Sequence, residues 1–338
     1  MNAYDQRYEI RKAKEEDIPK IMSFISQNWR EDHIMATNRL FFEYEFLESD
    51  GSVNFILAID REKETIEAIN GILKASHDSE CLDIFGSFWK TLSGNMGFLG
   101  LELIKRKNTL FGARAAIGVG DNPKTSVPLM KILHRYTSKM KHYYRLAERD
   151  DYLIAKIECK HTEKITDSMT GSIVEYKDIE ELKNNFDVEA YKDKIPYKDA
   201  WYINHRFFNH PIYKYNVYGI EQNGMAKAII VLRREVHNSR IAIRFVDYIG
   251  DESVFSVTRN FFDELLQEQE VEYIDFYCEG FNDENIISAG FIQLQEGDSN
   301  IIPNYFNPFL QENIDIYVSS SEPNTRFTKA DADQDRPN

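Results

Sequence analysis

The predicted strands and helices follow the same order twice along this chain of 338 residues. In the first half, the hydrophobic patterning predicts strands at 8–12, 54–60, 67–75, 82–92 and 113–119, and helices from 15, over 38–46, from 101 and over 126–135. The second half repeats this order with strands at 172–176, 216–221, 226–232, 240–249 and 272–278, and helices at 179–185, 254–267 and from 283. The motif Asn204-His205-Arg206-Phe207-Phe208 echoes Asn38-Arg39-Leu40-Phe41-Phe42, with Arg39 and Arg206 lying 167 positions apart. A tandem duplication accounts for this repetition.

We therefore expect an α/β fold (α+β, mixed sheets) with two domains, each a mixed, mostly antiparallel sheet flanked by helices. The chain is long enough for each domain to bury a core of its own. The expected boundaries are 1–160 for the first domain, 161–171 for a linker and 172–318 for the second domain. Residues 319–338 are rich in Ser, Asp, Asn and Pro, and we predict a disordered tail there.

The charge balance narrows the class of partner. A formal net charge of −15 and a pI near 5.1 disfavour binding to nucleic acids or anionic membranes. The basic run Lys105-Arg106-Lys107 can still serve a phosphate, although such a run at a helix end is usually a solvated face. Small molecules are the expected partners.

Cysteine content and apolar runs bear on location. The three cysteines, Cys81, Cys159 and Cys278, are odd in number and widely spaced, which indicates neither a disulfide framework nor a zinc site. The start of the sequence shows no apolar signal region, and no run approaches the roughly 20 apolar residues of a membrane span. We expect a cytoplasmic protein that needs no metal.

A glycine-rich loop, Ser93 to Gly100, separates a predicted strand from a predicted helix. Glycines at 94, 97 and 100 let the backbone approach an anion, and the helix dipole adds to the attraction. The loop is therefore a candidate pyrophosphate cradle, with a purely structural turn as the alternative. A P-loop is excluded because Leu101-Glu102 follow the last glycine, and a dinucleotide fold is disfavoured because several elements precede the loop.

The equivalent loop in the second half, Ile249 to Ser253, has one glycine and two acids. Two carboxylates repel a diphosphate. We therefore expect the first half to hold the phosphate-bearing ligand and the second half to shape an acceptor pocket or an interface.

The loop Asn95-Met96-Gly97-Phe98-Leu99-Gly100 resembles the Arg/Gln-x-x-Gly-x-Gly/Ala motif of the GNAT N-acyltransferase superfamily. The resemblance implies two tandem GNAT-like domains and an acyl-CoA co-substrate, either acetyl-CoA or another acyl-CoA. It also implies that the fourth strand, near Trp89 to Leu92, supplies backbone donors to the reaction's oxyanion. The cofactor-binding residues implied in this way are Trp89, Thr91, Leu92, Asn95, Gly97, Phe98, Gly100 and Asn122, the last of which follows the fifth strand.

Two further segments, 28–36 and 301–306, make the whole chain similar to tandem GNAT-like proteins of surface-polysaccharide gene clusters. Those proteins are associated with acylation of amino sugars, often nucleotide-linked. The resemblance therefore implies a small amine as acceptor, a nucleotide-linked amino sugar among the options, and it allows a homodimer.

Direct attack of an amine on a thioester needs a base for the amine and an acid for the leaving thiolate. The candidate bases are His33, with a helix cap as the alternative role, and Asp83, with a solvated strand end as the alternative. The tyrosine that serves as the general acid in the superfamily is expected near Met130. The nearest tyrosine is Tyr136, which can equally be a half-buried helix aromatic. His205 and His210 flank Phe207-Phe208 and are candidates for an acceptor site at the domain interface, or else packing residues.

Two functions of different classes remain at this point. The first is an acyl-CoA-dependent N-acyltransferase. The second is a non-catalytic tandem GNAT-like protein that binds a ligand or a partner protein. It is kept because the general-acid tyrosine is missing from its expected position and the loop of the second half has lost the glycine pattern. Aminoacyl transfer from tRNA, as in Fem-type tandem proteins, is disfavoured by the negative charge.

Overall fold

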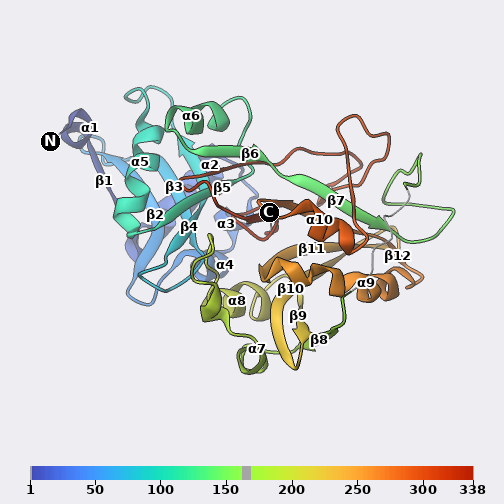
Figure 1. Ribbon diagram of the computed structural model, residues 1–338. Helices are drawn as coiled ribbons and strands as arrows, with labels where there is room; N and C mark the ends of the chain where they lie inside the picture. Colours follow the sequence, from blue (N-terminus) through green and yellow to red (C-terminus); the bar gives the residue numbers. More distant parts are fainter. Residues whose placement is uncertain (1, 162–168, 338) are drawn as a thin grey trace.

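The computed structural model describes residues 2–161 and 169–337 (Figure 1). The elements of the first half are α1 (Ala3–Arg7), β1 (Tyr8–Lys14), α2 (Ile18–Asn28), α3 (Ile34–Thr37), α4 (Arg39–Phe46), β2 (Ser52–Asp60), β3 (Ile66–Lys74), β4 (Asp83–Thr91), α5 (Leu99–Phe111), β5 (Ala115–Val119), α6 (Ser126–Ile132), β6 (Tyr136–Lys139) and β7 (Lys141–Leu146). Those of the second half are β8 (Ser172–Tyr176), α7 (Ile179–Asn185), α8 (Ala200–Ile203), β9 (Asn216–Gln222), β10 (Met225–His237), β11 (Arg240–Gly250), α9 (Thr258–Leu266), β12 (Val271–Glu279), α10 (Asp283–Ser288), β13 (Ile292–Gln293), β14 (Tyr305–Phe306), β15 (Phe309–Leu310), β16 (Tyr317–Ser320) and β17 (Phe327–Thr328).

Two large mixed sheets form the molecule. The strand order is β1-β2-β3-β4-β5-β16-β6 in the first sheet and β8-β9-β10-β11-β12-β7-β13 in the second. Neighbouring strands are antiparallel except for one parallel pair in each sheet, β4 with β5 and β11 with β12. The predicted fold class, two mixed and mostly antiparallel sheets flanked by helices, is confirmed.

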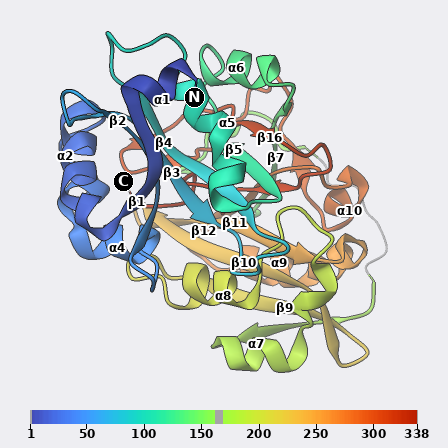
Figure 2. The same ribbon diagram turned by 90° about the vertical axis from the view of Figure 1, so that its left-hand side faces the viewer.

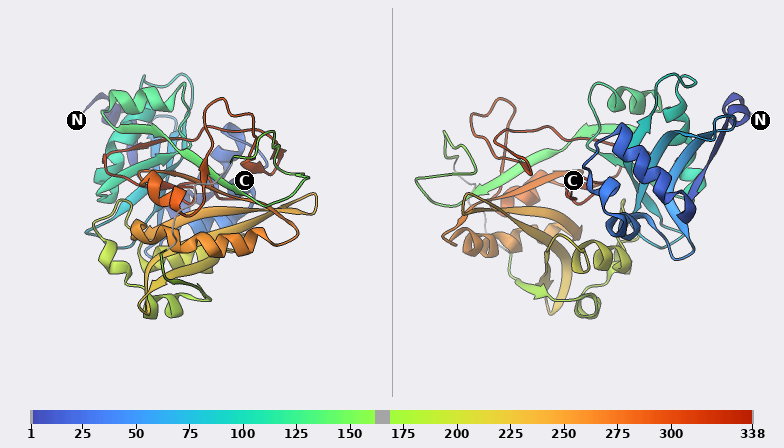
Figure 3. Two further views of the ribbon diagram at one scale, coloured as in Figure 1. Left: turned by 45° about the vertical axis from the view of Figure 1, so that its right-hand side comes forward. Right: turned by 180° about the vertical axis from the view of Figure 1, so that it is seen from behind.

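The two sheets exchange strands. The strand beside β5 is β16, which comes from the end of the chain, and the strand beside β12 is β7, which comes from the first half. A single residue, Met140, joins β6 in the first sheet to β7 in the second, so this ribbon runs from one sheet to the other (Figure 3). Neither half of the chain builds its sheet alone.

Helices cover both faces of the first sheet (Figure 2). Helix α2 buries Ile18, Ile21 and Ile25, whose spacing puts them on one side of the helix, in a core shared with α4. That core continues into the second half and takes in Tyr202 and Phe207. Helix α5 packs on the opposite face with a separate core. The α2 and α4 face of the first sheet therefore lies toward the second half.

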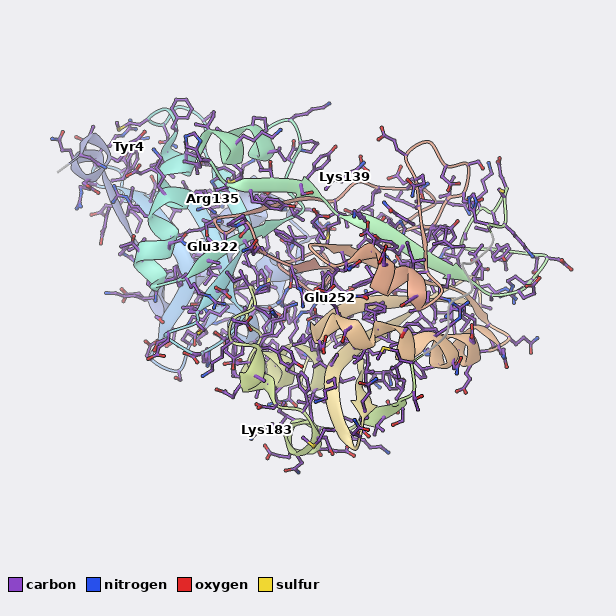
Figure 4. All side chains as sticks on the ribbon, viewed as in Figure 1. Tyr4, Arg135, Lys139, Lys183, Glu252 and Glu322 are labelled. Carbon is purple, nitrogen blue, oxygen red and sulfur yellow. The ribbon has the colours of Figure 1, made fainter. Side chains whose placement is uncertain are left out.

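The predicted disordered tail from Ser319 is wrong for the described residues 319–337. This stretch contains part of β16 and all of β17, and Ala330, Asp331 and Ala332 are fully buried. Its charged residues find buried partners of opposite charge: Asp331 lies 2.7 Å from Lys198, and Asp335 lies 2.6 Å from Arg233. A polar composition suggested a solvated tail because the sequence alone does not show these pairs. Glu322, labelled in Figure 4, accordingly lies among the elements of the first half.

Smaller differences concern element ends. The helix predicted over 126–135 stops at Ile132, and Tyr136 begins a strand instead. The repeated motif is helical in both halves but differs in detail: Asn38 caps α4, whereas Asn204–Phe208 form a π-helical turn. Residues 162–168 of the predicted linker lie outside the described residues. Within the described part of the chain, no helix is both long enough and apolar enough to cross a membrane.

Candidate functional site

The parallel strands β4 and β5 separate after three paired residues. Pairing ends at Phe85 and Ile117, and beyond it no described strand pairs with β4 on this side. On its other side, β4 has a bulge where the register with β3 shifts, so that Phe88 is the extra residue. Phe88 takes a positive φ of 33°, which is rare for a residue with a side chain. The outer part of β4 therefore presents free backbone groups to an extended ligand.

A cavity of about 590 Å³ occupies the gap between β4 and β5. This volume lies within the usual range of small-molecule sites, roughly 300–1,000 Å³. Ile104 and Lys107 of α5 line one part, whereas Trp29, which follows α2, and Tyr305 line another. Because α2 and α5 cover opposite faces of the sheet, the cavity runs through the gap from one face to the other.

The glycine loop ends beside this gap, at the first turn of α5. None of the described residues accepts a hydrogen bond from the N–H groups of Gly97, Gly100 or Leu101. Phe98 precedes the helix with a positive φ of 62° and is 70 % exposed. Two tyrosines brace the loop from behind, since the Tyr8 hydroxyl accepts from Met96 N at 3.1 Å and the Tyr4 hydroxyl donates to Gly97 O at 2.7 Å. The loop thus offers free donors at a helix N-terminus, an arrangement suited to an anion.

The two later glycines of the loop have different roles. A Cβ on Gly100 would lie 2.6 Å from Thr91 Oγ1 and 2.9 Å from Trp89 Nε1, so only glycine allows this close approach of α5 to β4. A Cβ on Gly97 would meet nothing within 4 Å. Trp89 Nε1 also donates to Gly100 O at 3.1 Å and fixes the start of the helix.

Three charged residues that sequence reasoning did not assign to the site line the cavity: Lys107, Asp121 and Asp333. Lys107 is only 3 % exposed, and burial together with Arg135 lowers its pKa to about 7. Burial raises the pKa of Asp121. Asp333 accepts a hydrogen bond from Ser87 Oγ at 3.4 Å, next to the bulge in β4. Lys107 looked like part of a solvated charge run, and Asp333 reaches β4 only because the end of the chain is folded.

Comparison with known proteins addresses the fold. No family model matches the chain, and no curated protein matches its sequence. A crystal structure of a GCN5-related N-acetyltransferase from Anabaena variabilis superposes with a TM-score of 0.55 at 11% identity, over 93% of this chain and 72% of its own. A probable N-acyltransferase from Enterococcus faecalis gives 0.54 at 11% identity with the same coverage, and a GCN5-related N-acetyltransferase from Kribbella flavida gives 0.51 at 9%, over 95% of this chain and 72% of its own.

The fold is that of tandem GNAT-like structures. At this level of identity the similarity concerns the fold alone. The residues predicted for the site are therefore described by where this structure places them.

Most residues predicted to bind the co-substrate of a GNAT enzyme lie at the gap between β4 and β5 or at the loop beside it. Trp89 and Asn122 line the cavity, and Thr91 lies against Gly100. The Asn95 side chain donates to Leu92 O at 3.0 Å and holds the loop together. Leu92 N already donates to Glu67 O at 2.9 Å, so this N–H group is not free for a ligand.

His33 lies near the cavity but does not line it. Its ring packs edge-on against Phe88, 5.0 Å away between centroids, and its Nδ1 accepts from Met35 N at the start of α3. Burial lowers its pKa to about 4, so the ring is neutral at physiological pH, and its single proton must lie on Nε2. The ring is therefore a helix cap and a donor in this arrangement, which leaves its predicted role as a base without support from the geometry.

Asp83 and Tyr136 lie away from the cavity lining. Arg114 holds the fully buried Asp83 carboxylate with two hydrogen bonds, at 3.0 and 2.5 Å, and Tyr197 N donates to it as well. These contacts tie the start of β4 to the second half. The Tyr136 hydroxyl donates to Glu279 Oε1 at 2.7 Å. Both side chains thus connect the halves in this structure.

His205 lines a different cavity, of about 230 Å³, between the two halves. Its ring stacks between Tyr44 and Trp201, with centroids 4.1 and 5.0 Å away, and burial lowers its pKa to about 4. His210 is buried beside this cavity, where its Nδ1 accepts from the backbone of Tyr213 at 2.9 Å. The predicted position at the domain interface is thus what the structure shows, and the acceptor role remains a prediction.

Among the described residues of the second half, the corresponding place holds a small cavity of about 30 Å³, lined in part by Tyr248, Gly250, Phe281 and Arg326. Pairing of β11 with β12 ends at Phe245 and Phe276, whose rings stack 4.3 Å apart between centroids. Beyond that point β17 pairs with β12, and Tyr248 stacks on Phe255 at 4.8 Å. Glu252 of the degraded loop, labelled in Figure 4, pairs with Arg326 of the same chain. The expectation that the first half holds the phosphate-bearing ligand stays a prediction.

Proposed function

We propose that this protein is an acyl-CoA-dependent N-acyltransferase that uses the cavity between β4 and β5. The observation that carries the proposal is the position of this cavity beside the free N–H groups of the glycine loop. A ligand with a diphosphate at one end and an extended amide chain at the other matches both parts. The N–H groups bind the diphosphate, and the unpaired edge of β4 binds the chain.

The acid in the first turn of α5 is held within the protein. Glu102 receives two hydrogen bonds from Arg106, at 2.9 and 2.7 Å, and Arg106 also pairs with Asp5 at 2.6 Å. Arg106 thus offsets one of these two carboxylate charges, and one negative charge remains at this end of the helix. The α5 dipole and the free N–H groups attract the diphosphate against this remaining charge.

In the proposed reaction, an acceptor amine enters from the Trp29 and Tyr305 side and attacks the thioester carbonyl. Backbone donors at the bulge of β4 stabilise the oxyanion. The Asp333 carboxylate lies at this bulge and takes the proton from the amine. The C–S bond then breaks as the amide forms, and the Asp333 carboxyl group passes the proton taken from the amine to the thiolate, so that coenzyme A leaves as its thiol.

For the acceptor we propose a small amine of the amino-sugar class, nucleotide-linked as the resemblance implies. Trp29 is 51 % exposed and Tyr305 is 38 % exposed, and both lie in the lining. Exposed aromatic faces suit stacking on a sugar ring or a base. A link to surface-polysaccharide synthesis rests on the resemblance alone.

A binding protein without turnover is the second candidate. The observation that favours it is that none of the three predicted catalytic side chains, His33, Asp83 and Tyr136, lines the cavity in the described structure. Release of free thiol separates the two candidates, because only an enzyme releases coenzyme A from acetyl-CoA when an amine is added.

The first experiment is calorimetric titration of the protein with acetyl-CoA and with coenzyme A. Gly97→Asp places a carboxylate at the free N–H groups without steric conflict, and Gly97→Asn is its uncharged control of the same shape. We expect micromolar binding by the wild type, retained by Gly97→Asn and lost in Gly97→Asp. Equal binding by both variants would place the diphosphate elsewhere. No binding by the wild type would overturn the proposed function.

A further inference from the structure

The inner end of the cavity has a polar floor. Gly86 and Gly118 follow the last paired residues of β4 and β5, and both line the cavity there. A Cβ on Gly86 would lie 3.4 Å from Lys107 Nζ, and a Cβ on Gly118 would lie 3.0 Å from Asp121 Oδ2. The point where the strands diverge thus holds an amine and a carboxyl group rather than apolar side chains.

Lys107 lies at this depth because of the helix geometry. Helix α5 runs back along β4 from the loop, and eight residues separate Leu99 from Lys107. At 1.5 Å per residue this is about 12 Å, which brings Lys107 level with the inner end of the cavity. A chain that starts at the loop and follows β4 inward therefore ends near the Lys107 amine.

The charges on this floor are not paired. Among the described residues, Lys107 Nζ has no hydrogen-bond or ion-pair partner, and Asp121 Oδ2 is buried without one. The charged groups around the amine are Arg135, which precedes β6, and Asp121, with Lys90 and Asp333 further along the lining. Figure 4 shows Arg135 within the first half, close to β6. The buried Lys107 and the half-buried Arg135 thus face the carboxyl group of Asp121, so an anion beside Lys107 would meet two basic groups and one carboxyl group.

An apolar stretch leads to this floor, since Ile104 and Met130 line the same cavity. We propose that the donor's acyl group is a short methylene chain that ends in a carboxylate, of the succinyl type, and that Lys107 binds this carboxylate. This inference rests on the proposed function, because it concerns the inner end of the same site. Lys107 then determines which acyl group is transferred.

Binding of a carboxylate changes the proton count at Lys107. The amine is only partly protonated near pH 7, because burial and Arg135 lower its pKa to about 7. An anion beside it favours the charged form, so the complex takes up a proton. The affinity for a succinyl donor is therefore expected to fall as the pH rises above 7, whereas the affinity for an acetyl donor is not.

The test is calorimetric titration of the full-length protein with succinyl-CoA, acetyl-CoA and coenzyme A, in the wild type and in Lys107→Met. Lys131→Met is the matched control, because Lys131 is exposed on α6 and lies outside the cavity lining. A charge-assisted hydrogen bond predicts that succinyl-CoA binds roughly 10-fold or more tightly than acetyl-CoA. Lys107→Met should remove this difference, and Lys131→Met should keep it.

The outcomes separate the inference from the proposed function. If acetyl-CoA and succinyl-CoA bind with equal affinity to the wild type, the inference is wrong and the proposed function stands. If the preference for succinyl-CoA persists in Lys107→Met, Lys107 is not its cause and the inference is also wrong. If none of the three ligands binds, both proposals fail together.

Discussion

Lys107 is a buried amine without a partner, and a residue of this kind reduces stability. Replacement by Met keeps the length of the side chain and removes the amine. We expect Lys107→Met to raise the free energy of unfolding by about 1–3 kcal/mol at pH 7. Urea denaturation of both proteins measures this difference. An unchanged or lower stability would mean that the amine has a partner in solution.

The difference in stability between the wild type and Lys107→Met depends on pH, because the pKa of Lys107 is lowered in the folded protein. Between about pH 7 and the ordinary lysine value, the unfolded chain carries a proton at this position that the folded protein lacks. The free energy of unfolding of the wild type therefore rises with pH across this window, because of Lys107. The difference in free energy of unfolding between Lys107→Met and the wild type should become smaller over the same window. Lys329 also has a pKa lowered to about 7 and is present in both proteins. The difference between the two proteins therefore isolates Lys107.

Asp333 is the carboxylate placed to accept the amine's proton. Asp333→Asn keeps the shape and the contact with Ser87 Oγ but removes the base. General-base catalysis typically contributes 10²- to 10⁴-fold, so we expect kcat to fall by roughly 100-fold or more while the affinity for coenzyme A stays the same. Thiol-release kinetics and calorimetry measure the two quantities. Unchanged turnover would assign the base to another group or to water.

For single residues, the sequence predicted the site residues that are placed by neighbouring elements of the chain. It missed those that are placed by contacts between residues far apart in the sequence. The glycines at 97 and 100 and Asn122 lie at the cavity or its loop, because strand, loop and helix follow each other directly. Asp333 contacts Ser87, which lies 246 positions away in the sequence, and no local sequence pattern predicts that contact. Lys107 differs from its neighbour Lys105 only in the face of α5 on which it lies, which the basic run obscured.

The glycine loop and the start of α5 act together as one element. Gly100→Ala would force the helix away from Thr91 and Trp89, and we expect a loss of about 1–3 kcal/mol in stability together with weaker binding of coenzyme A. Gly97→Ala is the matched control, because its Cβ enters open space, and its effect should stay within about 0.5 kcal/mol. Thermal unfolding and titration measure both effects. Equal behaviour of the two variants would contradict the close contact of α5 with β4.

Element positions followed well from the sequence where continuous buried runs are separated by a charged turn. The strands predicted at 54–60 and 67–75 correspond to β2 and β3, because their buried runs and the charged turn between them leave little choice. The secondary structure after Ile132 was not predicted from the sequence. Tyr136–Lys139 and Lys141–Leu146 form strands that the patterning did not indicate, since each is completed only by a partner strand from the other half of the chain.

The strand exchange ties the two sheets of the molecule together. The first sheet needs β16 from the end of the chain, and the second sheet needs β7 from the first half. The repeated order of elements predicted two domains. It could not show that each half of the chain contributes a strand to the sheet of the other half. A local pattern is the same whichever sheet a strand joins.

This exchange predicts one cooperative unfolding transition for both halves. Trp29 and Trp89 lie in the first half and Trp201 lies in the second, so fluorescence can follow each half separately. Trp201→Phe leaves reporters in the first half only, and the double variant Trp29→Phe with Trp89→Phe leaves the reporter in the second half. In urea, each variant's fluorescence midpoint should coincide with the midpoint of its own circular dichroism signal, because loss of one sheet removes a strand from the other. A fluorescence transition that precedes the circular dichroism transition in either variant would show that the halves unfold independently.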